Sequence, residues 1–420
     1  MAGSELYTDI IEVNPPLIFY EMVLLTGGVL TKPAYVLGVC SVAALSALWA
    51  LRLKGPLAGL AAVAAFLLGG LTDFGQRDHL ALIFLVPFLL GDAAARRERV
   101  LVGAWAFLGA GLKPYLLLIP IAAALTRAVL QRSLRPIFSA EMITLGVLCA
   151  GYLALVAIFH RPYLTDIVPL GQFVYGAYGA PIKPQLSALS LVIVVVAIIP
   201  VILRDKERIP TAVATLGALA SYYIQGRNWS YHFVPAVGLG LFLAVWSAKQ
   251  NRGMALLAAS LALAQAARGP HQRKSPSPIL AGATSVAFFS SHVWAAYPTA
   301  LDCGVRNATR YPALWVLPGA WNVLHDPDGT EADRQRAKRI LAREREIIRG
   351  DLLRDKPQLL YLDVRERKPY FTRPFDYRSF IGPLPGYRPV GRISIPEITY
   401  EVWAVERAPV SGTRCHTVTS

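Results

Sequence analysis

The stretch Thr72-Asp73-Phe74-Gly75-Gln76-Arg77-Asp78-His79 separates two apolar runs, residues 56–71 and 80–90. It places two carboxylates, a guanidinium, an imidazole and an amide together in an otherwise apolar region. Ionisable groups at the end of a membrane helix are costly unless they face water or a partner. The stretch is therefore either an ordinary polar loop between helices or part of a polar site. Three further polar segments, described below, favour the site.

The composition indicates a polytopic helical membrane protein. Of 420 residues, 54% are hydrophobic and only 16% are charged, which is too apolar for a typical soluble domain. Lysine and arginine number 42 against 27 acids, and in a membrane protein such an excess first indicates basic cytoplasmic loops. The sequence contains no zinc-type spacing, glycine-rich phosphate loop or nucleic-acid module, so neither a metal nor nucleic acid is expected.

Apolar runs along the first two thirds of the chain predict the membrane helices. A full span needs about twenty residues, so the shorter run 15–30, which follows two prolines, is expected to lie along the membrane surface. The candidate spans are residues 34–51, 56–71, 80–90, 100–130, 143–159, 186–203, 211–224, 233–247 and 254–267.

The run 100–130 is interrupted at Lys113-Pro114 and has arginine clusters at both ends, in 96–99 and 127–135. One long span would put these clusters on opposite sides of the membrane. A broken hairpin with its turn at Lys113-Pro114 would keep both on the cytoplasmic side, as the positive-inside rule favours. We prefer the hairpin. The polar segments then expected on the outer face are 9–16, 72–79, 113–114, 161–184 and 225–232, together with the chain after 267.

The last third of the chain has frequent charges and no spanning run. Residues 285–290 and 313–317 are predicted as short buried strands, 331–349 as a charged helix and 359–364 as a strand. Residues 387–395 and 399–405 are predicted to close the sheet as a pair. The expected fold is an α-helical polytopic membrane bundle with a small C-terminal extracytoplasmic α/β domain. The predicted parts are a first outer loop (1–33), the bundle (34–267), a linker (268–278), the α/β domain (279–410) and a tail (411–420).

The four cysteines divide into two kinds. Cys40 and Cys149 lie in apolar runs and are expected to be small core residues. Cys303 and Cys415 lie in the C-terminal region and can pair if that region is extracytoplasmic.

Charged and aromatic side chains gather in the segments predicted to lie outside. Arginine offers a fixed fork of donors that suits phosphate oxygens, and a nearby carboxylate can act as a general base toward an acceptor hydroxyl. The candidate phosphate-binding residues are Arg77, Lys113, Lys183, Arg227 and His232, and the candidate bases are Asp9, Glu12 and Asp78. Candidates for a sugar or acceptor pocket are Asn14, Gln76, His79, Trp229 and Tyr231. Such a pocket suits sugar transfer from a polyprenyl-phosphate carrier, because cations stabilise the charge on the departing phosphate.

A loop ending in the helix start Asn14-Pro15-Pro16-Leu17 resembles the first outer loop of GT-C type glycosyltransferases, which include protein O-mannosyltransferases and lipid A aminoarabinose transferases. Residues 7–20, 73–79, 111–115 and 225–232 resemble a group of bacterial membrane proteins within that class. The resemblance implies a multi-pass protein of the bacterial inner membrane. It also implies a polyprenyl-phosphate sugar as donor, no certain cofactor, and a glycan, lipid or protein acceptor.

In that class a first membrane helix and an acid-bearing segment precede the Pro-Pro-Leu element. Here only thirteen residues precede Asn14, so the start is expected to be truncated, and the polypeptide as written would lack activity if the usual acid is missing. Two other functions fit the pattern. A transporter or flippase for a lipid-linked anion would use the broken hairpin to bind its substrate, and a non-catalytic subunit of envelope polysaccharide assembly would need no catalytic acid.

Overall fold

The computed structural model describes residues 5–178, 187–268, 283–292, 296, 300, 303–395 and 398–405. Its residues fall into two units. The bundle unit comprises Asn14–Phe159 and Ala180–Gln272, and the sheet unit comprises Met1–Val13, His160–Gly179 and Arg273–Ser420. The chain is therefore mostly helical, with a small sheet domain near its C-terminus.

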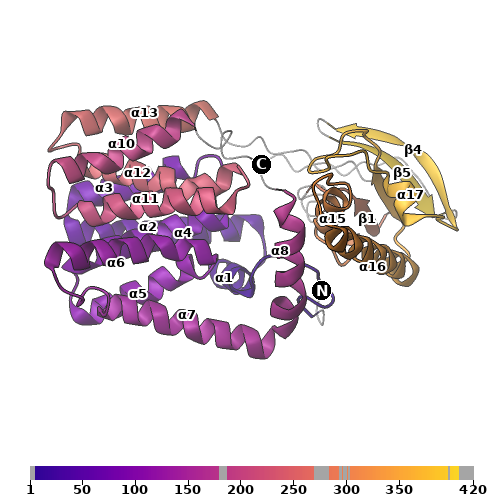
Figure 1. The fold of residues 1–420 in the computed structure, drawn as a ribbon, viewed down its shortest axis with the longest axis horizontal. Helices are drawn as coiled ribbons and strands as arrows, with labels where there is room; N and C mark the ends of the chain where they lie inside the picture. The colour runs from indigo at the N-terminus through magenta and orange to yellow at the C-terminus, as the bar shows by residue number, and fades with distance from the viewer. Residues whose placement is uncertain are drawn as a thin grey trace. The chain divides into compact units, whose positions relative to one another are not determined.

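The bundle unit consists of helices joined by short turns (Figure 1). Its α-helices are α1 (Pro16–Thr26), α2 (Lys32–Lys54), α3 (Pro56–Gly69), α4 (Arg77–Leu89), α5 (Arg96–Ala110), α6 (Leu118–Gln131), α7 (Ala140–Phe159), α10 (Ala188–Ile202), α11 (Ile209–Gln225), α12 (Val234–Ser247) and α13 (Arg252–Arg268). Short 3₁₀ turns are η1 (Gly91–Ala93), η2 (Pro114–Leu117) and η4 (Ser230–Phe233). These helices match the predicted runs to within a few residues at most ends.

Helices α4 and α12 form the centre of the bundle, since nearly every residue of each is buried. Small residues allow the close approach that such packing needs. A Cβ atom on Gly69 would lie 3.1 Å from the Cα of Gly238, and one on Gly238 would lie 2.1 Å from a methyl carbon of Leu82. Glycine at these two positions therefore lets the backbones of α3 and α12 approach each other and lets the Leu82 side chain of α4 pack on the backbone of α12.

The outer helices present an apolar surface. Leu37 and Leu48 of α2, and Val147, Leu153 and Ile158 of α7, are each more than half exposed. Large exposed apolar areas are unfavourable in water and mark contact with lipid or protein. Within the described residues, four helical stretches are long and apolar enough to cross a membrane: Lys32–Lys54, Pro114–Gln131, Ala140–Phe159 and Ser230–Ser247.

The run 100–130 is a hairpin, as predicted. Helix α5 ends at Ala110, η2 starts at Pro114, and α6 returns from Leu118. Arg99 at one end and Arg127 at the other both lie within electrostatic reach of Asp92, so the two basic clusters share one end of the bundle.

The same end carries the other basic turns. Lys54 pairs with Asp92 at 3.5 Å and with Glu207 at 3.1 Å. These contacts join the turns after α2, α4 and α10.

The sheet unit contains a mixed five-stranded sheet in the order β2-β1-β3-β5-β4. Strand β1 pairs in parallel with β2 and β3, whereas β5 pairs antiparallel with β3 and β4. The strands are β1 (Ser285–Phe289), β2 (Arg306–Asn307), β3 (Leu359–Asp363), β4 (Tyr387–Ile395) and β5 (Ile398–Val405). Its helical elements are a short π-helix at Tyr163–Ile167, α8 (Val168–Gly176), α15 (Val316–Leu324), α16 (Glu331–Asp355) and α17 (Tyr377–Ile381).

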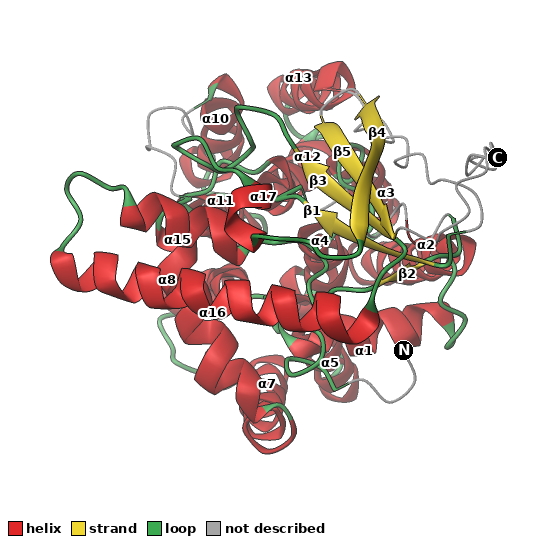
Figure 2. Ribbon diagram, turned by 90° about the vertical axis from the view of Figure 1, so that its right-hand side faces the viewer, coloured by secondary structure: helices red, strands yellow, loops and turns green. Residues whose placement is uncertain are grey.

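Alternation along the strands gives this sheet two apolar faces. Phe289 and Leu362 pack with Leu341 and Ile348 of the long helix α16, which runs beside the sheet in Figure 2. On the other face Phe288 stacks on Tyr361 at 4.7 Å. The period-2 pattern thus fills two cores with one sheet.

Segments from distant parts of the sequence complete the sheet unit. The backbone N–H of Ile11 donates to the carbonyl of Arg310 at 2.9 Å, and the indole of Trp315 donates to the carbonyl of Ile11 at 3.4 Å. The segment 161–184 was predicted to lie on the outer face; its described part, 161–178, is largely helical and belongs to this unit. Its membership therefore differs from the predicted division in chain order.

One predicted strand of this region is wrong, and the predicted Cys303–Cys415 disulfide involves one cysteine outside the described residues. Residues 313–317 form no strand: they lead into helix α15, which begins at Val316. A five-residue apolar run does not by itself distinguish a strand from a buried helix start. Cys303 is disulfide-bonded, and Cys415 lies outside the described residues.

Helix α16 carries a buried carboxyl, Glu344, which is 2% exposed. Burial raises the pKa of Glu344 to about 7, against the opposing effects of Tyr311 and Arg310. The folded protein then holds this proton more tightly than the unfolded chain does. The contribution of protonated Glu344 to the free energy of unfolding is complete below its ordinary pKa of 4.5 and is lost as the pH rises through about 7.

We therefore expect Glu344→Gln to stabilise the sheet unit at pH 8, by up to about 3 kcal/mol because each unit of pKa shift corresponds to about 1.4 kcal/mol. The difference from wild type should vanish near pH 4. Hydrogen exchange of peptides covering α16 in the full-length protein measures both. Glu346→Gln, at an exposed position of the same helix, should change little at either pH. An equal gain at both pH values would contradict the assignment to Glu344 ionisation.

Candidate functional site

Three polar segments of the bundle unit meet at one end of its helices. They are the start of α4, the break between α5 and η2, and the turn between α11 and η4. Because successive helices run in opposite directions, these helix ends lie on the same side as each other and opposite the basic turns described above. Interactions between their side chains, described next, bring six residues into one cluster, which we call the cationic cluster: Arg77, Asp78, Lys113, Gln225, Arg227 and His232.

At the centre of the cationic cluster is a buried ion pair. The Lys113 Nζ donates to Oδ2 of Asp78 at 2.5 Å and to Oε1 of Gln225 at 3.4 Å. Asp78 is fully buried and Lys113 is 7% exposed. Two opposite charges that pair in an apolar interior hold each other in place.

Local sequence explains why Lys113 points into this interior. Its backbone is extended, with φ −152° and ψ 133°, the conformation that a following proline favours. Pro114 then starts the 3₁₀ turn η2. Because Lys113 lies in the break and not in either helix, its side chain does not follow the surface of α5 or α6.

Two arginines add positive charge that the ion pair does not neutralise. Arg77, Arg227 and Lys113 all lie within electrostatic reach of the His232 imidazole. Arg77 is half-buried and has neither a hydrogen bond nor an ion pair with any residue the structure describes. Within the described part of the chain, the Nδ1 of His232 and the Oδ1 of Asp78 are likewise buried without a hydrogen-bond partner. The cluster is therefore cationic, and two of its buried polar atoms have no hydrogen-bond partner among the described residues.

An aromatic pair borders the cationic cluster. Trp229 and Tyr231 stack with ring centroids 5.7 Å apart, and the Lys113 Nζ lies 4.9 Å from the centroid of Tyr231. The turn that carries them is fixed by Gly226, whose φ of 61° ends α11 in the left-handed region. Asn228 also has a positive φ and accepts a hydrogen bond from Tyr222 at 2.7 Å.

The loop before α4 is held by His79. The backbone N–H of Gly75 donates to its Nδ1 at 3.0 Å, which leaves the Nε2–H to donate to the carbonyl of Phe66 at 2.9 Å. His79 is 1% exposed, so in this conformation neither ring nitrogen is available to a ligand. Its predicted place in a sugar pocket stays a prediction, while its contacts give it a structural role. Gln76 is exposed and precedes the first residue of α4.

The remaining predicted site residues lie elsewhere. Asp9 and Glu12 belong to the sheet unit; Asp9 accepts a hydrogen bond from the backbone of Glu5, and Glu12 from that of Val13. Asn14 begins the bundle unit just before α1. Lys183 lies outside the described residues. The predicted roles of these four residues stay predictions.

No family model, no curated protein and no solved structure matches this chain. Among the residues described, no group of three or more His, Cys, Asp or Glu side chains is placed to hold a metal ion. Function must therefore be argued from the geometry of the cationic cluster and its surroundings.

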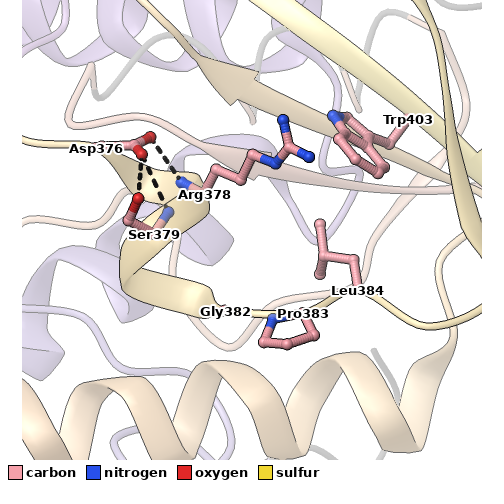
Figure 3. A pocket seen from close by; sticks show the side chains of 7 residues that line it. All are labelled: Asp376, Arg378, Ser379, Gly382, Pro383, Leu384 and Trp403. Atoms are coloured by element: carbon pink, nitrogen blue, oxygen red, sulfur yellow. Dashed lines mark hydrogen bonds between the residues drawn. The ribbon is translucent and has the colours of Figure 1, made fainter.

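A pocket that no sequence pattern indicated lies in the sheet unit. It has a volume of about 590 Å³ and is lined by Asp376, Arg378, Ser379, Gly382, Pro383, Leu384 and Trp403 (Figure 3). The Arg378 guanidinium lies 4.7 Å from the Trp403 ring centroid. Asp376 caps the short helix α17 by accepting from the backbone N–H of Arg378 and Ser379. Its exposed charges suit a solvent-facing surface.

Removing Lys113 tests the ion pair. Lys113→Met would leave Asp78 charged and buried without its cation, which costs about 3–5 kcal/mol in comparable pairs. We expect a lower unfolding midpoint in mild detergent for Lys113→Met and recovery of most of the loss in the double variant Lys113→Met/Asp78→Asn. Arg96→Met, at an exposed position at the opposite end of the bundle, is the control. Wild-type stability in the single variant would show that the pair does not hold the fold.

Proposed function

We propose that the chain is an integral-membrane glycosyltransferase that moves a sugar from a polyprenyl-phosphate donor to an envelope acceptor, on the outer face of a bacterial inner membrane. The observation that carries the proposal is the cationic cluster at the helix ends of an apolar bundle. A lipid-linked phosphate has the same two parts, an anionic group joined to a hydrocarbon chain. Four helices long and apolar enough to span a membrane support this setting.

The proposal divides the charges by task. Lys113 is neutralised by Asp78, so Arg77 and Arg227 would supply the net positive charge for the phosphate. Arginine suits this task because its planar fork can donate two hydrogen bonds to phosphate oxygens. Trp229 and Tyr231 would offer ring faces for the sugar or for the first part of the lipid.

In the proposed reaction the acceptor hydroxyl oxygen attacks the anomeric carbon of the sugar. The bond from that carbon to the phosphate oxygen breaks, and the phosphate leaves with the electron pair, which the arginines stabilise. A base takes the hydroxyl proton. Because Asp78 is buried and bound to Lys113, it fits better as the residue that positions Lys113 than as the base.

A second function is favoured by one observation, the ion pair at a broken helix. Transporters bind charged substrates at such breaks, so a transporter or flippase for a lipid-linked anion would use the same Lys113 and Asp78. The position of the cluster at helix ends favours the transferase, because a transporter site is expected at mid-depth. A non-catalytic assembly subunit would need none of these charges.

Arg77→Gln tests the proposal. We expect the full-length variant in lipid nanodiscs to bind polyprenyl phosphate about tenfold more weakly or worse, since a charged hydrogen bond is lost, and to lose sugar transfer in cells. Native mass spectrometry measures the binding, with polyprenol as the uncharged comparison. Arg96→Gln, at the opposite end of the bundle, should behave as wild type.

Three outcomes separate the alternatives. Weaker binding with loss of transfer supports the transferase. Loss of lipid translocation while transfer by other enzymes continues supports the flippase. If deleting the protein reduces envelope polysaccharide but the Arg77→Gln strain makes the normal amount, the result supports an assembly subunit and rejects the transferase.

A further inference from the structure

A cavity in the bundle unit lies among α1, α2, α4 and α5, and it is lined by residues outside the cationic cluster. It has a volume of about 360 Å³, within the range of small-molecule sites. Its walls are mainly apolar and include Leu24, Leu37, Phe84, Trp105 and Leu108. One ionisable side chain, Glu21, faces this space.

Glu21 is buried without a partner. It is 3% exposed, and both carboxylate oxygens lack a hydrogen-bond partner in the part of the chain that the structure describes. No described lysine, arginine or histidine forms an ion pair with it. A buried carboxylate in apolar surroundings is strongly unfavourable unless a donor or cation reaches it. Burial raises the pKa of Glu21 to about 9, so the carboxyl holds a proton while the cavity is empty, and a cation that enters the cavity can replace that proton.

The neighbouring polar groups are already engaged. The hydroxyl of Thr26 donates to the carbonyl of Met22 at 2.8 Å, and that of Ser41 donates to the carbonyl of Leu37 at 2.8 Å. Tyr35 lies within electrostatic reach of Glu21, but its hydroxyl donates to the carbonyl of Gly75 at 2.5 Å. None of these three donors turns to the carboxyl.

The cavity adjoins the apolar outer surface of the bundle. Leu24 and Leu37 both line it, and each is 69% exposed. Exposed apolar side chains at the rim of an apolar cavity favour a ligand that arrives with a hydrocarbon chain, since that chain can cover them. The ligand should therefore come from the lipid phase.

We infer that this cavity binds an amphiphile that carries a primary ammonium group, with its alkyl chain against the apolar wall and its ammonium on Glu21. An ammonium has three N–H donors and a positive charge, so it can satisfy both carboxylate oxygens and their charge together. An alcohol offers one donor and no charge, and a trimethylammonium offers charge without a donor. An anionic headgroup is repelled. The inference does not depend on the proposed transferase activity.

Trp105 makes the inference measurable, because it lines the cavity and bromine quenches indole fluorescence on contact. The full-length protein is placed in nanodiscs of phosphatidylcholine, whose headgroup has no N–H. It is then titrated with bromododecylamine, bromododecanol and bromododecyl-trimethylammonium. We expect the amine to quench at a concentration at least about tenfold lower than the alcohol, because hydrogen bonds to charged groups are strong. The trimethylammonium compound should fall between them.

Two variants assign the signal. Trp105→Phe should remove the amine-specific quenching, and Glu21→Gln should raise the amine concentration required to that of the alcohol. Glu98→Gln is the matched control: Glu98 already binds Trp49 and Arg52, and its loss should leave the preference for amine unchanged. Equal quenching by amine and alcohol in the wild type would overturn the inference, whether or not Glu21→Gln folds. So would an unchanged amine preference in a folded Glu21→Gln protein.

Discussion

The contact between Lys113 and Asp78 is the constraint on which the polar end of the bundle depends. Neither charge is tolerable alone at that depth, and each is brought there by a backbone feature: the break before Pro114 for the lysine and the first turn of α4 for the aspartate. Their pairing ties α4 to the α5–α6 hairpin and, through Gln225, to α11. The loop between α3 and α4 must then close, which His79 achieves by bridging two backbone groups.

Once the pair is neutral, the surplus charge of the cationic cluster comes from Arg77 and Arg227. This arrangement gives the charges different surroundings: Lys113 and Asp78 pair and hold the helices, whereas Arg77 has neither a hydrogen bond nor an ion pair with any residue that the structure describes. The cavity among α1, α2, α4 and α5 contains the opposite kind of group, because the acid Glu21 faces its apolar walls. One bundle thus carries two polar groups of opposite charge within mainly apolar surroundings.

Periodicity and helix punctuation were enough to predict the bundle helices, the hairpin at Lys113 and most of the sheet, because apolar runs and prolines act locally. The co-location of Arg77, Lys113 and His232 could be predicted from charge distribution alone. The pairing of Lys113 with Asp78 could not, because 35 residues separate them and a sequence does not show which charges meet. Glu21 gave no signal, since a single acid in an apolar helix has no pattern. Residues 313–317 were wrongly predicted as a strand, because an apolar run of five residues is too short to distinguish a strand from the start of a buried helix.

The sheet unit is assembled from three separated pieces of chain, and this has a consequence for synthesis. Ile11 must wait for Trp315, 304 residues later, before their hydrogen bond can form. At translation rates of about 5–20 residues per second, that wait lasts on the order of 15–60 s. During it only part of the native surroundings of this segment exists, namely His160 and Tyr163, whose rings contact Tyr7. Ile11 thus reaches its contact with Trp315 long after it is made, and a ribosome that stalls before Trp315 leaves this contact unformed.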